Sequence, residues 1–184
     1  MMTTFLKHQV SEPTYFPQSA SDEHAAFAMW LVRSLQPKRI VQFGTHNGYS
    51  YFAMCQAVKE AGLSSECFAV DTWREDAHAD DDLEAIYARV SGENRKYEQF
   101  STLLRKTFYE ALEDIEDGSV DLLHIDGRHF YPDIKRGFDH WAPKLSKRAV
   151  VLFHNTMKKE PGFGVEAFWA DISQMRPSFN FSHC

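Results

Sequence analysis

The spacing of apolar residues alternates along the chain between a helical period and short continuous runs that are typical of buried strands. The continuous runs predict strands over residues 39–43, 66–71, 97–101, 120–126, 148–153 and 178–181. Helical spacing predicts a first helix between Ser21 and Pro37, and later helices over residues 49–61, 83–90, 104–115, 132–141 and 165–172. Strands that alternate with helices favour a mostly parallel sheet with helices on both faces, because parallel neighbours need a crossover. The predicted fold class is therefore α/β, arranged as a three-layer α/β/α sandwich.

The N-terminal segment differs from the rest of the chain because it lacks a sustained apolar period. Residues 1–20 carry Pro13 and Pro17 among polar and aromatic residues, which indicates an arm on the surface. Residues 21–184 show no repeat or linker, so we expect them to form a single domain. The core is expected to include the aromatic residues of the predicted helices, namely Phe27, Trp30, Phe138, Trp141, Phe168 and Trp169.

Composition and charge exclude several classes of partner. The 184 residues include 20 basic and 26 acidic ones, a net charge of -6, whereas a nucleic-acid backbone is bound through clustered Lys and Arg. No apolar run approaches the ~20 residues that span a bilayer, and the N-terminus lacks the pattern of a secretion signal. The three cysteines form no Cys-x-x-Cys pair and give an odd total for a disulfide framework. We expect a cytoplasmic protein that binds neither nucleic acid nor a membrane.

Residues that follow the predicted strands are the first candidates for chemistry, because ligands of parallel sheets bind outside the carboxyl ends of the strands. The loop from Gly44 to Gly48 lies between a strand and a helix, where glycines admit a ligand and helix amides face its anionic end. Asp71 ends the next strand, where a carboxylate holds a ribose diol in nucleoside-binding folds. His46 stands where a dinucleotide-binding loop has a glycine, which disfavours a dinucleotide. These residues predict a nucleoside site.

Four ordered motifs carry a resemblance to a known family. They are VQFGTHNGYS at 41–50, VDTW at 70–73, VDLLHIDGRHFY at 120–131 and VVLFHNT at 150–156. Together they resemble class I S-adenosylmethionine-dependent methyltransferases, most closely the bacterial branch near macrolide-sugar O-methyltransferases and more distantly catechol O-methyltransferase. The likeness extends over residues 20–181. It implies a Rossmann-like class I methyltransferase fold with S-adenosylmethionine as cofactor.

The resemblance also implies which residues bind this cofactor. The methionine half is expected on the loop after the first strand, with Ser50 holding its carboxylate, and Asp71 is expected to take the ribose hydroxyls. Family members usually carry an acidic residue where Gln42 stands. Gln42 still accepts a hydrogen bond from the cofactor's ammonium group but supplies no charge. The full implied set is Gln42, Gly44, Thr45, Asn47, Gly48, Ser50, Asp71, Asp126 and Trp73, which would flank the adenosine.

A catalytic pair and a candidate metal site follow from the same resemblance. In the catechol enzymes the aspartate that matches Asp126 binds magnesium, and the residue three positions later, here His129, is the general base. A neutral imidazole takes a hydroxyl proton at physiological pH. The implied metal ligands are Asp126, His154 and Asn155, a mixed nitrogen and oxygen set that suits a transition metal better than magnesium. A divalent metal ion is therefore a second candidate cofactor.

The predicted function is S-adenosylmethionine-dependent methylation of a hydroxyl on a small molecule or sugar, with His129 as general base and Asp126 orienting that base or a metal ion. An NAD-dependent oxidoreductase shares the strand, the glycine turn and the terminal acid, and remains an alternative. A non-catalytic cofactor-binding domain is the other alternative, because Gln42 and Asn155 depart from the family pattern. The remaining histidines His24, His124 and His140 are expected on structural faces outside the site.

The C-terminal end also departs from the family. Family members continue into a hairpin of two final strands, whereas this chain ends at Cys184. We expect either a sheet that lacks its last strand or a fragment of a longer protein. An open sheet edge invites pairing with a second copy, so a homodimer belongs to the expected arrangements.

Overall fold

The computed structural model describes residues 12–17, 24–74, 82–126, 131–154, 156–157 and 164–180, apart from the side chain of Asp133. The strands are β1 (Arg39–Phe43), β2 (Glu66–Asp71), β3 (Ser101–Arg105), β4 (Val120–Ile125) and β5 (Leu145–Phe153). The α-helices are α2 (Ala25–Leu35), α3 (Tyr49–Glu60), α4 (Leu83–Asn94), α5 (Tyr131–Trp141) and α6 (Val165–Ile172). Two short 3₁₀ helices, η1 (Glu110–Asp114) and η2 (Ala142–Lys144), complete the described elements.

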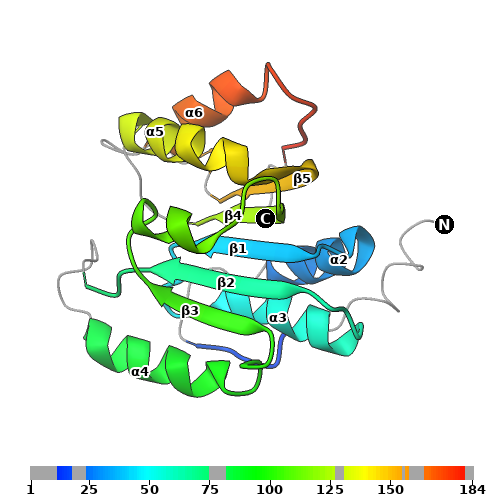
Figure 1. Ribbon diagram of the computed structural model, residues 1–184, viewed down its shortest axis with the longest axis vertical. Helices are drawn as coiled ribbons and strands as arrows, with labels where there is room; N and C mark the ends of the chain where they lie inside the picture. Colours follow the sequence, from blue (N-terminus) through cyan, green and yellow to red (C-terminus); the bar gives the residue numbers. More distant parts are fainter. Residues whose placement is uncertain are drawn as a thin grey trace.

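The strands form one parallel sheet in the order β3-β2-β1-β4-β5 (Figure 1). β1 is central, and the chain adds β2 and β3 on one side before it crosses to add β4 and β5 on the other. In parallel sheets, ligands bind outside the carboxyl ends of the two strands where the direction changes, here β1 and β4. The predicted α/β class and its mostly parallel sheet are confirmed.

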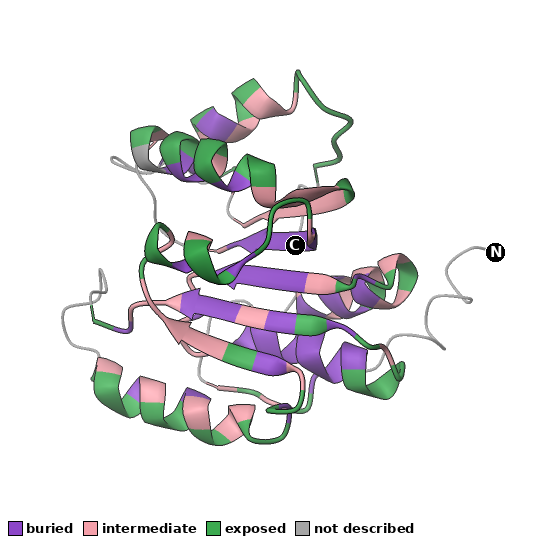
Figure 2. Ribbon diagram, viewed as in Figure 1, coloured by how far each residue is buried: buried purple, intermediate pink, exposed green. Residues whose placement is uncertain are grey.

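Helices cover both faces of the sheet, which gives the predicted three layers (Figure 1). The helices α2, α3 and α4 pack on the face that carries Ile40 and Leu122. The 3₁₀ helix η1 and the end of α5 pack on the face that carries Val41 and Leu123, and α6 packs against α5. All six residues of β4 are buried as a result (Figure 2). Within the described residues, no helix combines the length and the apolar character that crossing a membrane requires.

The third strand and the element after it differ from their predictions. The strand expected over residues 97–101 begins only at Ser101. The helix expected over residues 104–115 is wrong, because the first of these residues belong to β3 and the later ones form only the short helix η1. Tertiary packing turns the apolar side chains inward without a long helix, since Phe108 stacks on Phe43 with ring centroids 4.5 Å apart.

The helix α2 buries a different face from the one predicted. It begins at Ala25, and Ser21, the expected N-terminal limit of this helix, lies outside the described residues. Its buried residues are Ala25, Ala28, Met29 and Val32. Trp30 is 38% exposed, so its assignment to the core is wrong. Small side chains allow α2 to lie close to α3, and the larger aromatic residue is left outside. The core assignments of Trp141 and Phe168 are confirmed.

The two ends of the described chain differ in how they pack against the domain. Residues 12–17 of the predicted arm lie along α3, where Thr14 donates from its amide to Gln56 Oε1 (2.8 Å) and the Tyr15 ring packs edge-on against Phe52. At the other end, residues 178–180 form no strand, and Phe179 is 85% exposed. The predicted sixth strand is therefore absent from the described residues, and its last residue, 181, lies outside them.

Candidate functional site

The carboxyl ends of β1, β2 and β4 meet at one edge of the sheet, and main-chain hydrogen bonds continue beyond the strands there. The Gly44 amide donates to Val70 O (3.1 Å), and the Asp126 amide donates to Phe43 O (3.0 Å). Gly44 is thereby held beside the end of β2, and Asp126 is held beside the end of β1. The predicted site residues of three strands are therefore neighbours in space.

Asp71 fastens the glycine turn to the end of β2. Its Oδ2 accepts a hydrogen bond from the His46 amide and its Oδ1 accepts one from the Trp73 amide, both at 2.8 Å. Both donors have left-handed backbone, with φ of 43° at His46 and 45° at Trp73, which is unfavourable for residues other than glycine. The carboxylate stabilises these conformations, and each oxygen keeps a lone pair for a ligand hydroxyl. Turn and acid form one unit.

Trp73 supports the same turn from inside the protein. Its side chain is 2% exposed, and its Nε1 donates to His46 O at 3.0 Å. Its ring also lies 5.0 Å from the ring of Tyr87 on α4. These contacts hold the turn, whereas a position of Trp73 beside an adenosine stays a prediction.

Arg105, which the sequence did not single out, holds the segment after Asp71 from the side of β3. Its guanidinium donates to the carbonyls of Thr72 and Trp73, both at 3.2 Å, and lies 4.5 Å from the centre of the Tyr87 ring. It also forms an ion pair with Glu84 at the start of α4. The strand register could have revealed this role, because Arg105 and Asp71 are partners across β2 and β3.

The other end of the glycine turn begins α3 at Gly48. Gly48 has a φ of 81°, and a Cβ added there would lie 2.6 Å from a ring carbon of Phe52. Glycine satisfies both the backbone conformation and the close approach. No described side chain caps this helix end. The amide N–H groups of its first turn therefore keep their positive ends directed toward the site.

Thr45 and Asn47 occupy the turn in different ways. Thr45 is 3% exposed, and its Oγ1 has no hydrogen-bond partner among the described residues. Buried hydroxyls are normally satisfied, so this oxygen marks a position for a further polar group. The Asn47 side chain is already engaged, because its Oδ1 accepts a hydrogen bond from Arg89 of α4 (3.0 Å). The Tyr15 hydroxyl donates to the Asn47 carbonyl (3.1 Å), so the N-terminal segment also reaches the turn.

A buried polar row connects β1, α3 and β4 at this edge of the sheet, and it consists of His124, Gln42, Ser50 and Asp126. Gln42 Nε2 donates to Ser50 Oγ at 2.9 Å, and Gln42 Oε1 faces His124 Nδ1 at 3.2 Å. Ser50 Oγ lies 3.5 Å from Asp126 Oδ2. Gln42 is 0% exposed, whereas the Asp126 side chain is 23% exposed. The row therefore leads from the core to the edge of the site.

His124 lies on a structural face, as expected, and also contacts a predicted site residue. It is buried, and it contacts Gln42 directly. Burial lowers the pKa of its imidazole, and the neighbouring rings of His154 and His24 lower that pKa further, while Asp126 raises it. The net lowering favours the neutral imidazole. The sequence could have indicated that His124 lies next to Gln42. The two residues are register partners, and His124 lies two residues before Asp126 on the same face of β4.

The predicted metal ligands fall only partly within the described residues. His154 Nδ1 lies 4.0 Å from Asp126 Oδ1, and the His154 ring packs edge-on against His24 with centroids 4.9 Å apart. Asn155 lies outside the described residues, as does the predicted base His129. In the described part of the chain, no three His, Cys, Asp or Glu side chains converge to hold a metal ion. The donors present there do not complete a metal site.

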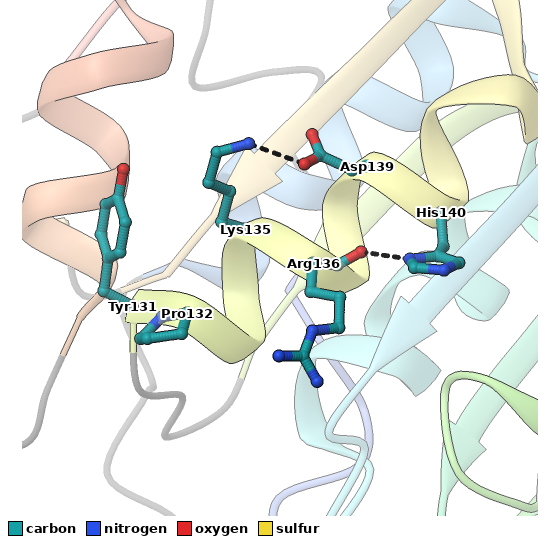
Figure 3. A pocket seen from close by; sticks show the side chains of 6 residues that line it. All are labelled: Tyr131, Pro132, Lys135, Arg136, Asp139 and His140. Atoms are coloured by element: carbon teal, nitrogen blue, oxygen red, sulfur yellow. Dashed lines mark hydrogen bonds and ion pairs between the residues drawn. The ribbon is translucent and has the colours of Figure 1, made fainter.

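A separate hollow lies along the solvent side of α5 (Figure 3). Its lining residues are Tyr131, Pro132, Lys135, Arg136, Asp139 and His140. Lys135 pairs with Asp139 at 2.7 Å, and His140 Nδ1 donates to the carbonyl of Arg136 at 2.7 Å. These polar groups satisfy one another along the helix, and none of the predicted site residues lines this hollow.

Residues 41–156 match a family described as a methyltransferase domain. The chain belongs to this methyltransferase-domain family. The matched range contains the glycine turn, Asp71 and the buried polar row, and the resemblance inferred from the four motifs is confirmed.

One relative of this methyltransferase domain is the uncharacterized protein y4gI of Sinorhizobium fredii. It is 58% identical over 175 residues, which are 95% of this chain and 19% of the relative. The chain thus spans about a fifth of that protein's length.

Solved structures share the fold of this methyltransferase domain at low sequence identity. The O-methyltransferase TomG of Streptomyces achromogenes, solved with SAM, has a TM-score of 0.66 and 16% identity over 95% of this chain and 83% of that one. The SAH-bound methyltransferase PaMTH1 of Podospora anserina has a TM-score of 0.63 and 16% identity over 96% of this chain and 86% of that one. The O-methyltransferase of Bacillus cereus, in complex with SAH, has a TM-score of 0.61 and 13% identity over 96% and 77%.

Proposed function

We propose that this chain is an S-adenosylmethionine-dependent methyltransferase that acts on a hydroxyl group of a small molecule or sugar. The observation that carries the proposal is the junction of the glycine turn with Asp71, where the His46 amide bonds the carboxylate at 2.8 Å. A backbone turn that opens a helix suits an amino-acid group, and a strand-end carboxylate suits a ribose diol. Membership of the methyltransferase-domain family and the ligands named for TomG and PaMTH1 support this choice of cofactor.

The residues present fit this cofactor. Asp71 retains lone pairs for the ribose hydroxyls, and the buried Thr45 hydroxyl lacks a partner among the described residues. The uncapped start of α3 at Gly48 and the partly exposed carboxylate of Asp126 supply groups of opposite polarity for a carboxylate and an ammonium. We therefore assign Gly44, Thr45, Gly48, Ser50, Asp71 and Asp126 to cofactor binding.

S-adenosylmethionine supplies, when bound, a methyl group made electrophilic by the sulfonium centre. The protein must orient an acceptor hydroxyl and remove its proton, and orientation can contribute ~7–11 kcal/mol to such a reaction. We assign proton removal to His129, whose ring nitrogen would accept the hydroxyl proton, a step that typically contributes 10²–10⁴-fold. Asp126, three residues earlier at the end of β4, would orient that histidine. No step is assigned to a metal ion, whose presence stays a prediction.

Calorimetric titration with S-adenosylmethionine, S-adenosylhomocysteine and NAD tests the cofactor. We expect heat with the first two compounds and none with NAD, and we expect Asp71→Asn to weaken both. Binding of NAD alone would overturn the proposal in favour of an oxidoreductase.

Transfer of a labelled methyl group to a panel of hydroxylated acceptors then tests the reaction. His129→Ala should lower turnover by at least about a hundredfold, the lower range of a general base. The surface variant His140→Ala serves as the matched control and should leave turnover unchanged. Cofactor binding without transfer to any acceptor would instead favour a non-catalytic binding domain.

A further inference from the structure

The buried polar row has a direction that its charged end imposes. The Asp126 carboxylate can only accept hydrogen bonds. The Ser50 hydroxyl, 3.5 Å from Asp126 Oδ2, therefore directs its proton to Asp126. Its oxygen then presents a lone pair to Gln42, whose Nε2 donates at 2.9 Å.

The same direction continues through Gln42 to His124. With its Nε2 turned to Ser50, the amide presents Oε1 to His124 Nδ1 at 3.2 Å. An acceptor that faces Nδ1 requires a hydrogen atom on that nitrogen. The negative charge of Asp126 thus determines, through three hydrogen bonds, which nitrogen of a buried imidazole carries the proton.

We infer that His124 is a positioning residue, which holds the Gln42 amide through Nδ1–H so that Gln42 in turn fixes Ser50 with its proton on Asp126. Gln42 is 0% exposed and both ends of its amide are occupied, so it orients the site from below and does not bind the cofactor's ammonium itself. As our proposal, this role replaces the predicted role of Gln42 as a cofactor ligand. The consequence for ligand binding rests on the proposed function, because Ser50 and Asp126 are the members of the row assigned to the cofactor.

The opposite direction is a well-defined alternative. A Gln42 amide rotated by half a turn would accept from the Ser50 hydroxyl and donate to a bare His124 Nδ1. Ser50 would then turn a lone pair toward the Asp126 carboxylate, and two acceptors would face each other at 3.5 Å. The two arrangements place the imidazole proton on different nitrogens, so the tautomer of His124 distinguishes them.

Nitrogen-15 NMR of the ligand-free protein near neutral pH measures that tautomer directly. The His124 ring signals are assigned by their loss in His124→Asn. We expect the proton on Nδ1 and a bare Nε2, whereas neutral histidine in water prefers the reverse. A proton on Nε2 overturns the inference. This measurement needs no cofactor, so it remains decisive even if the proposed function fails.

Ligand binding provides the second test, with S-adenosylhomocysteine compared against 5′-methylthioadenosine, which lacks the amino-acid part. Loss of one oriented hydrogen bond in His124→Leu should weaken S-adenosylhomocysteine binding roughly tenfold and leave 5′-methylthioadenosine binding unchanged. His124→Asn, whose short amide places an N–H near the position of Nδ1, should restore most of the affinity. His140→Asn on the outside of α5 is the matched control and should bind both ligands as the wild type does.

Two outcomes of the titrations contradict the inference. One is wild-type affinity for S-adenosylhomocysteine in His124→Leu, and the other is an equal loss for both ligands, which would mean general damage to the fold. If His124→Leu does not fold, a comparison of His124→Asn with His124→Gln decides, because the longer amide reaches the position of Nε2 and should not restore affinity. A wild-type protein that binds no S-adenosylhomocysteine refutes the proposed function and leaves the tautomer as the test of this inference.

Discussion

The substitution Asp121→Asn tests how much a buried carboxylate at the amino-terminal edge of the sheet contributes to stability. Asp121 lies in β4 and is 4% exposed. Its Oδ2 accepts hydrogen bonds from the Lys38 amide (2.7 Å) and Arg148 (3.0 Å), and its Oδ1 accepts one from the Ser146 hydroxyl (2.6 Å). This one side chain therefore connects β4 with β5 and with the residue that precedes β1.

The magnitude follows from the pKa of the Asp121 carboxyl. Burial alone raises this pKa, but the hydrogen bonds from Arg148, Ser146 and the Lys38 amide outweigh burial and lower it from 3.8 to about 2. At about 1.4 kcal/mol per unit, the shift corresponds to roughly 2 kcal/mol of stability. Because the folded pKa lies below the unfolded one, this stability is present above pH 3.8 and is lost as the pH falls toward about 2.

Urea denaturation at neutral pH and at several acidic pH values measures the effect. We expect Asp121→Asn to lower the free energy of unfolding by about 2 kcal/mol at neutral pH, and we expect the difference from the wild type to shrink below about pH 4. Asp117→Asn is the matched control, because Asp117 pairs with Lys144 while it is 73% exposed, and a pair of this kind contributes less than about 1 kcal/mol. Equal stability of wild type and Asp121→Asn at neutral pH, or a difference that persists at acidic pH, would refute the reasoning.

Three further substitutions test the site and the core. Gly48→Ala forces alanine into left-handed backbone and against the Phe52 ring, so thermal unfolding should show a loss of about 2 kcal/mol. Arg105→Ala should weaken S-adenosylhomocysteine binding in calorimetry by releasing the segment after Asp71, and Arg105→Lys should rescue little, because lysine lacks the planar fork that reaches both carbonyls. Trp141→Phe removes the Nε1 donor that bonds the Phe108 carbonyl and opens space in the core around the fully buried ring, and chemical denaturation should reveal a loss of about 1–3 kcal/mol.

The central strands could be predicted from the sequence because they are buried on both faces. Such strands consist of continuous runs of apolar residues. All six residues of β4 are buried, and β2 was predicted with its observed bounds, Glu66–Asp71. The strand β3 lies at the sheet edge, where Ser101 is buried, Thr102 is exposed and the three residues after it are half-buried, so its local pattern is weak. The apolar residues that follow β3 pack inward through contacts with β1 and α5, and such contacts leave no local period to read.

The candidate site shows the same division between local and distant information. The glycine turn and Asp71 could be predicted as neighbours, because the carboxyl ends of parallel strands meet at one edge. Arg105 and His124 were missed because their roles arise from register across strands, as Asp71 faces Arg105 and Gln42 faces His124. A register drawn from the predicted strands could have suggested both. The contact of Arg89 with the turn depends on how α4 packs, which no local pattern encodes.

The central strand β1 contacts both β2 and β4 at the site, and this position explains why a glutamine suits position 42. The turn after β1 is fastened to β2 through Asp71, while Gln42 links β1 to β4 through the buried polar row. An acidic residue at position 42 would place a carboxylate next to Ser50 and compete with Asp126 for the same hydroxyl proton. It would also add a like charge in a water-poor place, which raises the energy of the ionised form of either acid. The neutral amide avoids that repulsion and leaves the charge of Asp126, the more exposed end of the row, available to a cationic ligand group. Its dependence on His124 for orientation is the structural consequence.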